Sequence, residues 1–167
     1  ISCNNVLIIY LSALSAQTLN FFSYIYRYAA EADSHIRADM NSSNECVFCE
    51  IATTDRVIDQ TDHCFVIRDA FPVTEGHTLI IPKRHVPDYF DLNSIEASEI
   101  QHLLTKHKLQ IEQSDKSVDG FNIGVNVGTT AGQTVFHVHV HLIPRRIGDV
   151  ENPKGGVRGV IPAKQQH

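Results

Sequence analysis

The chain has 167 residues, of which 43% are hydrophobic and 20% are charged. This balance is that of one ordinary folded domain and excludes a disordered or fibrous chain. The formal net charge of −5 and the sequence pI near 6.0 offer no basic surface for a phosphate backbone, so we expect no nucleic-acid partner.

The first 39 residues are expected to lie outside the domain. Residues 6–14 are apolar, but a membrane-spanning helix needs about 20 residues, so no membrane association is predicted. This stretch ends in small residues as a secretory signal does, yet no Lys or Arg precedes it. Met40 is the one methionine and a candidate native start. We therefore expect a leader or non-native extension at 1–39, a domain at 40–167 and a cytoplasmic protein, with export as the alternative if the leader is a native signal.

From residue 61 onward the pattern predicts a sheet and one helix. Residues 64–69 and 77–82 have the composition of strands, with Gly76 in the turn of a hairpin. A helix is predicted over about 94–113, because Asn93 and Glu96 have the spacing of a capping box and apolar residues then recur at helical intervals. Strands at 121–127 and 135–143, joined by the loop 128–132, complete an α+β domain in which the helix lies against one face of an antiparallel sheet.

A pair of cysteines precedes these elements. Cys46 and Cys49 are separated by two residues, which is typical of a metal site or a redox motif. A redox motif is expected in a βαβ context, whereas an irregular turn at 53–55 follows here. Zinc is therefore the favoured hypothesis, provided that two histidines complete the site. Two reduced thiols in the core are the alternative.

The densest motif is the run of three histidines alternating with valine at residues 137–141. Successive side chains of a strand point to opposite faces, so the histidines should share one face. Three histidines in register are costly to bury without purpose, which argues against an ordinary core. A metal site built from all three is a second hypothesis. Phosphate binding is favoured by the donors of the preceding segment: Gly132, Gln133, Thr134 and Val135.

A histidine beside an α-phosphate can act as a nucleophile and split one difficult displacement into two easier ones. Its other ring nitrogen must then donate to an acceptor, which fixes the attacking tautomer. Donors around the phosphate oxygens stabilise the charge of the transition state. These requirements suit the run of histidines and the segment before it.

The segments HVHVHLI, GQTV and DAFPVTEGHTLIIPKRH resemble the histidine triad (HIT) superfamily, in the region of its Hint and Fhit branches. The resemblance covers about residues 46–149. It implies that His139 is the nucleophile and that His141 and Gln133 contact the scissile phosphate and leaving group. His137 would support His139. The nucleotide-binding positions that it implies are Asp69 at the ribose, Asn126, Thr134, Gly132 and Val135 at the phosphate, and Phe48, Ile51 and Ile67 at the base, where ordinary core packing is the alternative.

The resemblance also implies a structural zinc ion and an activity. The zinc ligands would be Cys46, Cys49, His85 and His137, a closed tetrahedral set. Related transferases carry glutamine in place of His141, so water is the expected final acceptor. The implied enzyme is a nucleotide hydrolase that releases AMP from diadenosine polyphosphates, which we favour, or from nucleoside 5′-phosphoramidates. The alternatives are a non-catalytic nucleotide sensor and a metal-dependent hydrolase. Family members usually form homodimers by joining their sheets edge to edge, and the same is expected here.

Overall fold

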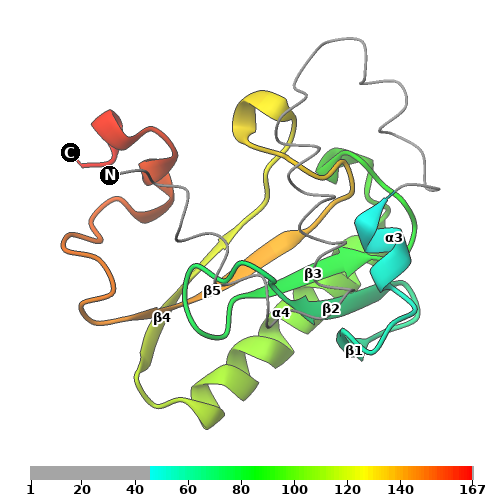
Figure 1. Cartoon of the computed structure of the whole chain (residues 1–167), viewed down its shortest axis with the longest axis horizontal. Coiled ribbons are helices and arrows are strands. Elements are labelled where there is room, and N and C mark those ends of the chain that lie inside the picture. Colours follow the sequence, from blue (N-terminus) through cyan, green and yellow to red (C-terminus); the bar gives the residue numbers. More distant parts are fainter. Residues whose placement is uncertain (1–45, 167) are drawn as a thin grey trace, which may run out of the picture. The chain divides into compact units, whose positions relative to one another are not determined.

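The computed structural model describes residues 46–166, which form one five-stranded sheet and one long helix (Figure 1). Residues 1–39, where a leader was expected, lie outside the described residues. In the described part, no helix is long and apolar enough to cross a membrane. The elements in chain order are α3 (Val47–Ile51), β1 (Val57–Gln60), β2 (Cys64–Arg68), β3 (Thr78–Pro82), η5 (Tyr89–Asp91), α4 (Ser94–Ser114), β4 (Val118–Gly124), η6 (Thr129–Ala131), β5 (Val140–Arg146), η7 (Gly156–Val160) and η8 (Pro162–Lys164).

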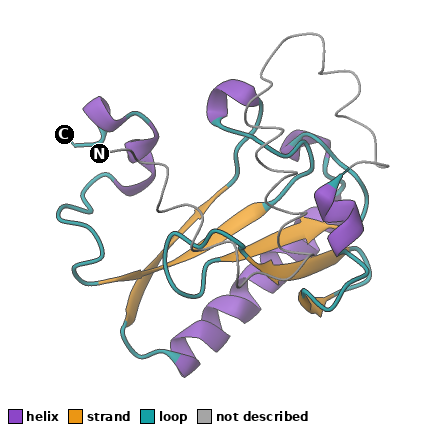
Figure 2. Cartoon of the chain, viewed as in Figure 1, coloured by secondary structure: helices purple, strands orange, loops and turns teal. Residues whose placement is uncertain are grey.

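The strands form an antiparallel sheet in the order β1-β2-β3-β5-β4. β2 and β3 form the predicted hairpin, in which Cys64 pairs with Pro82 and Arg68 pairs with Thr78. β5 lies between β3 and β4 and places His141 opposite Leu79. Helix α4 runs along one face of the sheet (Figure 2). The predicted α+β class is confirmed, and the short edge strand β1 is an element that the sequence pattern did not indicate.

Helix α4 begins as predicted. The Asn93 side chain accepts hydrogen bonds from the backbone N–H groups of Ile95 and Glu96, and the Glu96 carboxylate accepts from the Asn93 N–H. This capping box satisfies donors that the first turn leaves open. Glu96 is buried and also binds the Arg84 guanidinium at 2.7 Å, so it joins the helix start to the segment after β3. The buried apolar residues of the helix are those predicted from its periodicity: Ile100, Leu103, Leu104 and Ile111.

The main core lies between α4 and one face of the sheet. Alternate strand residues contribute to it: Cys64 and Val66 from β2, Ile80 from β3, Val140 and Leu142 from β5. Because side chains alternate along a strand, His141 belongs to the opposite face. The helix and the histidine chemistry are therefore on different sides of the sheet.

The boundaries of the last two strands differ from those predicted. β4 occupies Val118–Gly124 and β5 occupies Val140–Arg146, so both lie a few residues away from the expected 121–127 and 135–143. His137 and His139 consequently precede β5, and only His141 lies within it. The segment before β5 leaves the β3 ladder, since the Val138 N–H donates to the Val86 carbonyl at 2.7 Å. The alternation persists through this segment, with Val138 and Val140 in the core.

Strand β5 also continues past residue 143, where the predicted strand ends. Pro144 lies within β5 and pairs with Phe121 of β4. Its carbonyl accepts a hydrogen bond of 2.7 Å from the Thr74 hydroxyl in the loop between β2 and β3. The pairing of β5 with β3 has already ended at Leu142, so no amide hydrogen is needed on that side.

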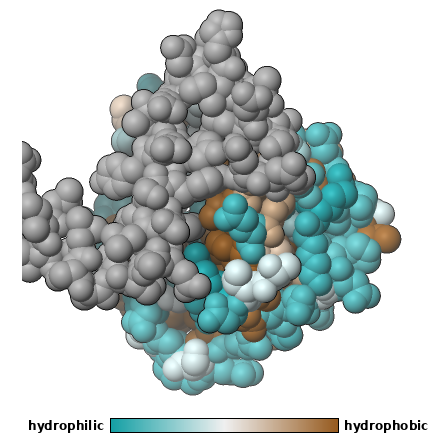
Figure 3. All heavy atoms as spheres, turned by 45° about the vertical axis from the view of Figure 1, so that its right-hand side comes forward, coloured by the Kyte–Doolittle hydropathy of each residue, from teal (hydrophilic) through white to brown (hydrophobic). Residues whose placement is uncertain are grey.

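The described surface carries scattered large hydrophobic side chains, among them Phe90, Ile147 and Val160. On the face shown in Figure 3, the described residues are mainly hydrophilic, with smaller hydrophobic areas between them. Single exposed hydrophobic residues of this kind are normal on folded proteins.

The ion pair of Glu99 with His63 links α4 to the turn before β2, and its strength depends on pH. The His63 ring, 2.8 Å away, and the Thr61 hydroxyl both bind this carboxylate. Hydrogen bonds from Thr61 and His63 lower the pKa of Glu99 from 4.5 to about 2, and Glu99 raises the pKa of His63 above 6.5. The carboxylate contributes stability above about pH 4.5 that is lost as pH falls towards 2, whereas the imidazolium contributes below pH 6.5 and loses its contribution at higher pH.

We therefore expect Glu99→Gln to lower the melting temperature most at pH 5–6, with a smaller difference from the unsubstituted protein at pH 2.5 and at pH 8. Thermal unfolding across this range measures it, and Glu151→Gln at an exposed position is the control. A difference that does not vary with pH would contradict the ion pair's contribution.

Candidate functional site

His139 lies beside the sheet with one ring nitrogen already engaged. Its Nδ1 is 2.8 Å from the carbonyl oxygen of His137, so Nδ1 carries hydrogen and donates. Nε2 then holds the free electron pair, which is the tautomer that nucleophilic attack requires. The ring is 7% exposed, and burial lowers its pKa below 6.5, which keeps it neutral.

His141 is hydrogen-bonded to a histidine that the sequence reasoning did not include in the site. Its Nδ1 is 2.9 Å from Nε2 of His77, which is 3% exposed and directly precedes β3. Burial lowers the pKa of His141 to about 4, and the neighbouring rings of His139 and His77 act in the same direction. The sequence carried no distinctive signal for His77, because its place beside His141 follows from the pairing of β3 with β5.

Asp69 lies beside His77, at the other end of the loop between β2 and β3. Its Oδ2 is 3.3 Å from His77 Nδ1, and its backbone N–H donates to the His77 carbonyl at 3.0 Å. Asp69, His77 and His141 therefore form a continuous polar chain. This places the predicted ribose-binding carboxylate near the third histidine of the triad.

The predicted phosphate loop is organised by Gln133. The side chain is 4% exposed, accepts from the Gly128 N–H at 2.8 Å, and donates to the carbonyls of Pro87 and Val135. In the structure this amide supports the loop from within, so its predicted phosphate contact requires an exchange of partners. Gly132 and Thr134 are exposed, and Val135 is half-buried. Asn126, which lies beyond β4, donates to the Gly132 carbonyl at 3.4 Å.

The apolar positions proposed for the base are all buried. The Phe48 ring, on α3, has its centre 5.0 Å from that of His139. Ile51 ends the same helix, and Ile67 lies on β2. Since Val66 faces α4, its neighbour Ile67 faces the opposite side, where His141 also lies. Base contact remains a prediction for these three residues, and the Phe48 ring packs against the triad.

The two cysteines and two histidines expected to bind zinc form a cluster. His137 Nε2 donates to the Pro82 carbonyl at 2.8 Å, so Nδ1 carries no hydrogen and its lone pair is available to a metal ion. That Nδ1 is 3.4 Å from the Cys46 sulfur and 3.6 Å from the Cys49 sulfur, and His85 Nδ1 is 3.5 Å from Cys49. Tetrahedral zinc with Zn–S of about 2.3 Å and Zn–N of about 2.0–2.1 Å requires sulfur-to-nitrogen separations of about 3.5 Å. The residues therefore fit a zinc ion.

The thiol chemistry agrees with this fit. Burial, followed by the neighbouring Cys46, raises the pKa of Cys49 to about 12, because a second thiolate beside the first is unfavourable without a compensating cation. A divalent cation supplies that compensation. The structure also divides the triad, since His137 joins the cysteines while His141 joins Asp69 and His77. Among the described residues, the three histidines do not form a single metal-ligand set, as one of the sequence hypotheses required.

The fold and the site together define a protein that holds a neutral histidine beside an antiparallel α+β sheet and uses a neighbouring histidine in a separate Cys₂His₂ cluster. Residues 51–148, well over half of the chain, match the HIT domain family. The chain belongs to this family.

Individual relatives agree with that assignment. An uncharacterized HIT-like protein of Mycoplasma genitalium is 36% identical over 110 residues, which cover 64% of this chain and 77% of the relative. Adenylylsulfatase HINT3 of Arabidopsis thaliana is 38% identical over 111 residues, which cover 64% of this chain and 55% of that protein. The crystal structure of a Zn-bound histidine triad family protein from Mycobacterium smegmatis aligns with a TM-score of 0.60 and 36% identity, covering 66% of this chain and 82% of that one.

Proposed function

We propose that this protein is a nucleotide hydrolase in which His139 attacks the α-phosphate. The observation that carries the proposal is the hydrogen bond between His139 Nδ1 and the His137 carbonyl, because it leaves Nε2 as the attacking atom. A bond forms between Nε2 and phosphorus while the bond from phosphorus to the leaving oxygen breaks. Water then attacks the same phosphorus and loses a proton to solvent, the nitrogen–phosphorus bond breaks, and AMP is released with His139 neutral again.

His141 is proposed to donate a hydrogen bond to the leaving oxygen and so to stabilise its developing negative charge. The Val73 N–H lies 3.4 Å from His77 Nδ1 and donates to it, so His77 Nε2 carries hydrogen and donates to His141 Nδ1. His141 Nε2 then carries the hydrogen of this hydrogen bond to the leaving oxygen. If His77 instead donates from Nδ1 to Asp69, the order reverses and His141 Nε2 becomes an acceptor. Ribose hydroxyls bound at Asp69 would occupy its carboxylate and favour the first order.

Cys46, Cys49, His85 and His137 are proposed to hold a structural zinc ion. The fit of their ligand atoms and the Zn-bound relative from Mycobacterium smegmatis support this assignment. When bound, the ion would compensate the negative charge of the two thiolates and hold His137 in place. The carbonyl of His137 orients the nucleophile. A homodimer is proposed by analogy with the family, with β4 as the candidate meeting edge because it is longer than β1.

A substrate panel tests the proposed activity. The purified protein is given diadenosine triphosphate, diadenosine tetraphosphate and adenosine 5′-phosphoramidate, and AMP release is measured by chromatography. We expect AMP from at least one of the three, with a dinucleoside polyphosphate hydrolysed fastest. A nucleotide sensor would bind AMP in a parallel calorimetric measurement but release none from any substrate. That result would contradict the proposed hydrolase.

A further inference from the structure

The loop between β2 and β3, residues 69–77, carries two members of the site at its two ends. Its Val73 side chain is 67% exposed. Asp69 and His77 close the loop through a backbone hydrogen bond of 3.0 Å. The position of both site residues therefore depends on the polar contacts that hold the intervening residues.

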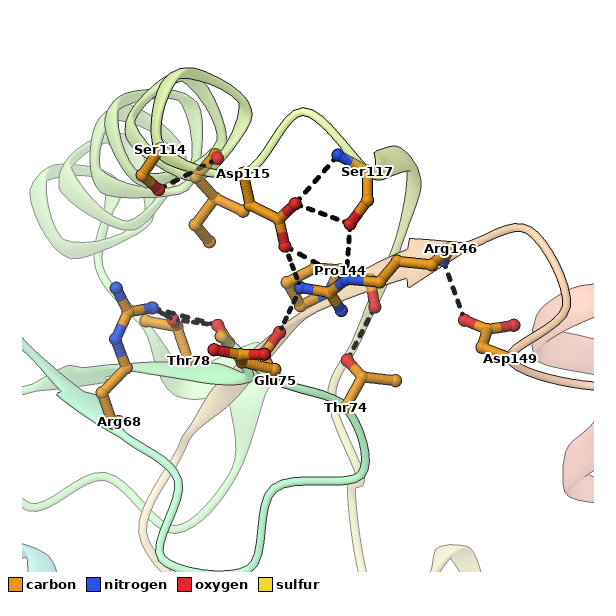
Figure 4. Close-up of polar contacts among 12 residues, drawn as sticks. Arg68, Thr74, Glu75, Thr78, Ser114, Asp115, Ser117, Pro144, Arg146 and Asp149 are labelled. Carbon is orange, nitrogen blue, oxygen red and sulfur yellow. Dashed lines mark hydrogen bonds and ion pairs between the residues drawn. The ribbon is translucent and has the colours of Figure 1, made fainter.

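Two of those contacts come from the far end of β5 (Figure 4). Arg68 of β2 supplies another, because its Nη1 donates to the Gly76 carbonyl at 3.0 Å. The Thr74 hydroxyl donates to the Pro144 carbonyl at 2.7 Å, and Arg146 Nη2 donates to the Glu75 carbonyl at 3.1 Å. The backbone carbonyl of Thr74 also accepts a hydrogen bond of 3.1 Å from the His77 N–H. The loop is thus held to the strand that carries His141, three and five residues beyond that histidine.

Arg146 is itself held in place. Its Nη2 and Nε bind the Asp115 carboxylate at 2.6 and 3.1 Å, and Nε also donates to the Ser117 hydroxyl at 3.2 Å. Asp115 caps the C-terminal end of α4, and Ser117 directly precedes β4. A guanidinium offers five donors in a fixed plane, which suits partners that lie on three different segments.

From these contacts we infer that Arg146, together with Thr74, is a positioning residue for nucleotide binding. It holds the loop so that Asp69 meets the ribose and His77 meets His141. The inference rests on the proposed function, because it takes Asp69 to be the ribose-binding group. The Arg146 side chain binds Asp115, Ser117 and Glu75 rather than a histidine of the triad, so its effect should appear in ribose recognition.

The neighbouring Arg145 provides a matched control. It lies on the same strand and forms comparable polar contacts, with Asp149 at 2.8 Å and with the Asn122 side chain at 2.6 Å. None of these contacts reaches the loop. Arg145→Met and Arg146→Met therefore remove equal charge and similar ion pairing, and only the second removes a contact to residues 69–77.

The experiment measures ribose discrimination, taken as the ratio of dissociation constants for 2′-deoxy-AMP and AMP, together with hydrogen exchange of the loop amides. We expect the unsubstituted protein to prefer AMP by about tenfold, since a hydrogen bond to a charged carboxylate is lost with the hydroxyl. Arg146→Met should bring the ratio close to one and accelerate exchange at residues 70–77 several-fold. Arg145→Met should leave both the ratio of dissociation constants and the loop exchange rates unchanged. Unchanged discrimination and unchanged loop exchange in Arg146→Met would overturn the inference.

Two further variants distinguish a failure of the Arg146 inference from a failure of the proposed function. If Asp69→Ala retains the unsubstituted ratio, the ribose assignment is wrong, and loop exchange in Arg146→Met alone decides whether Arg146 holds the loop. If Arg146→Met does not fold, Thr74→Val is measured in its place, because it removes only the hydroxyl bond to Pro144. It should lower the ratio and accelerate exchange at the same amides, and no change in either would overturn the inference.

Discussion

His139→Ala is expected to abolish turnover while AMP still binds. The substitution removes the attacking nitrogen, and the loss of a nucleophile lowers kcat by roughly 10³-fold or more. Asp69 and the loop around Gln133 do not depend on the His139 ring for their hydrogen bonds, so they remain to hold the nucleotide. Chromatographic AMP release and calorimetric AMP binding measure the two effects. His102→Ala, at an exposed position on α4, is the matched control and should leave both unchanged.

The covalent intermediate distinguishes attack by histidine from attack by water. Phosphoramidates are acid-labile, so the unsubstituted enzyme is denatured rapidly at alkaline pH with labelled substrate and then digested. The label should remain on a peptide that contains His139. Rescue of His139→Ala by imidazole without any labelled peptide would instead indicate general-base catalysis. Absence of label together with chelator-sensitive turnover would falsify the nucleotidyl-histidine mechanism in favour of a metal hydrolase.

Cys49→Ser is expected to remove the zinc ion and lower the melting temperature by on the order of 10 °C. Binding free energy at a closed structural site is also folding free energy, and a loss of several kcal/mol shifts the melting temperature of a chain of this size by that amount. Elemental analysis should give one zinc per chain before the substitution and none after it.

Cys64→Ser is the matched control for the zinc prediction. Cys64 is a fully buried core thiol outside the cluster, so its substitution also buries a hydroxyl but should keep the metal. We expect a smaller fall in melting temperature than for Cys49→Ser. Protein purified without chelators that holds no metal would favour the alternative of two reduced thiols in the core.

The sequence predicted those features that depend on local pattern. The capping box of Asn93 and Glu96 and the helical spacing that ends at Ile111 locate α4, and the alternation around Val140 separates core from site. Strand boundaries were harder, because Val138 takes its hydrogen-bond partner from Val86, about fifty residues earlier in the chain. The continuation through Pro144 likewise depends on Thr74, which no local pattern reveals.

The candidate site shows the same division. The cluster of Cys46, Cys49, His85 and His137 was expected from the resemblance, and the ligand atoms do come together. The place of His77 beside His141 was missed, because a single histidine before a strand carries no distinctive spacing. The internal bonding of Gln133 was missed as well, since an amide in a loop can face either solvent or the loop's own backbone.

The separation of α4 from the histidines by the sheet has a practical consequence for handling the protein. A fluorescent dye or a surface tether attached at Thr105, which is exposed on α4, would be anchored on the side away from His141. Immobilised protein could then be exposed to successive nucleotides in flow, with its chemistry facing the liquid rather than the support.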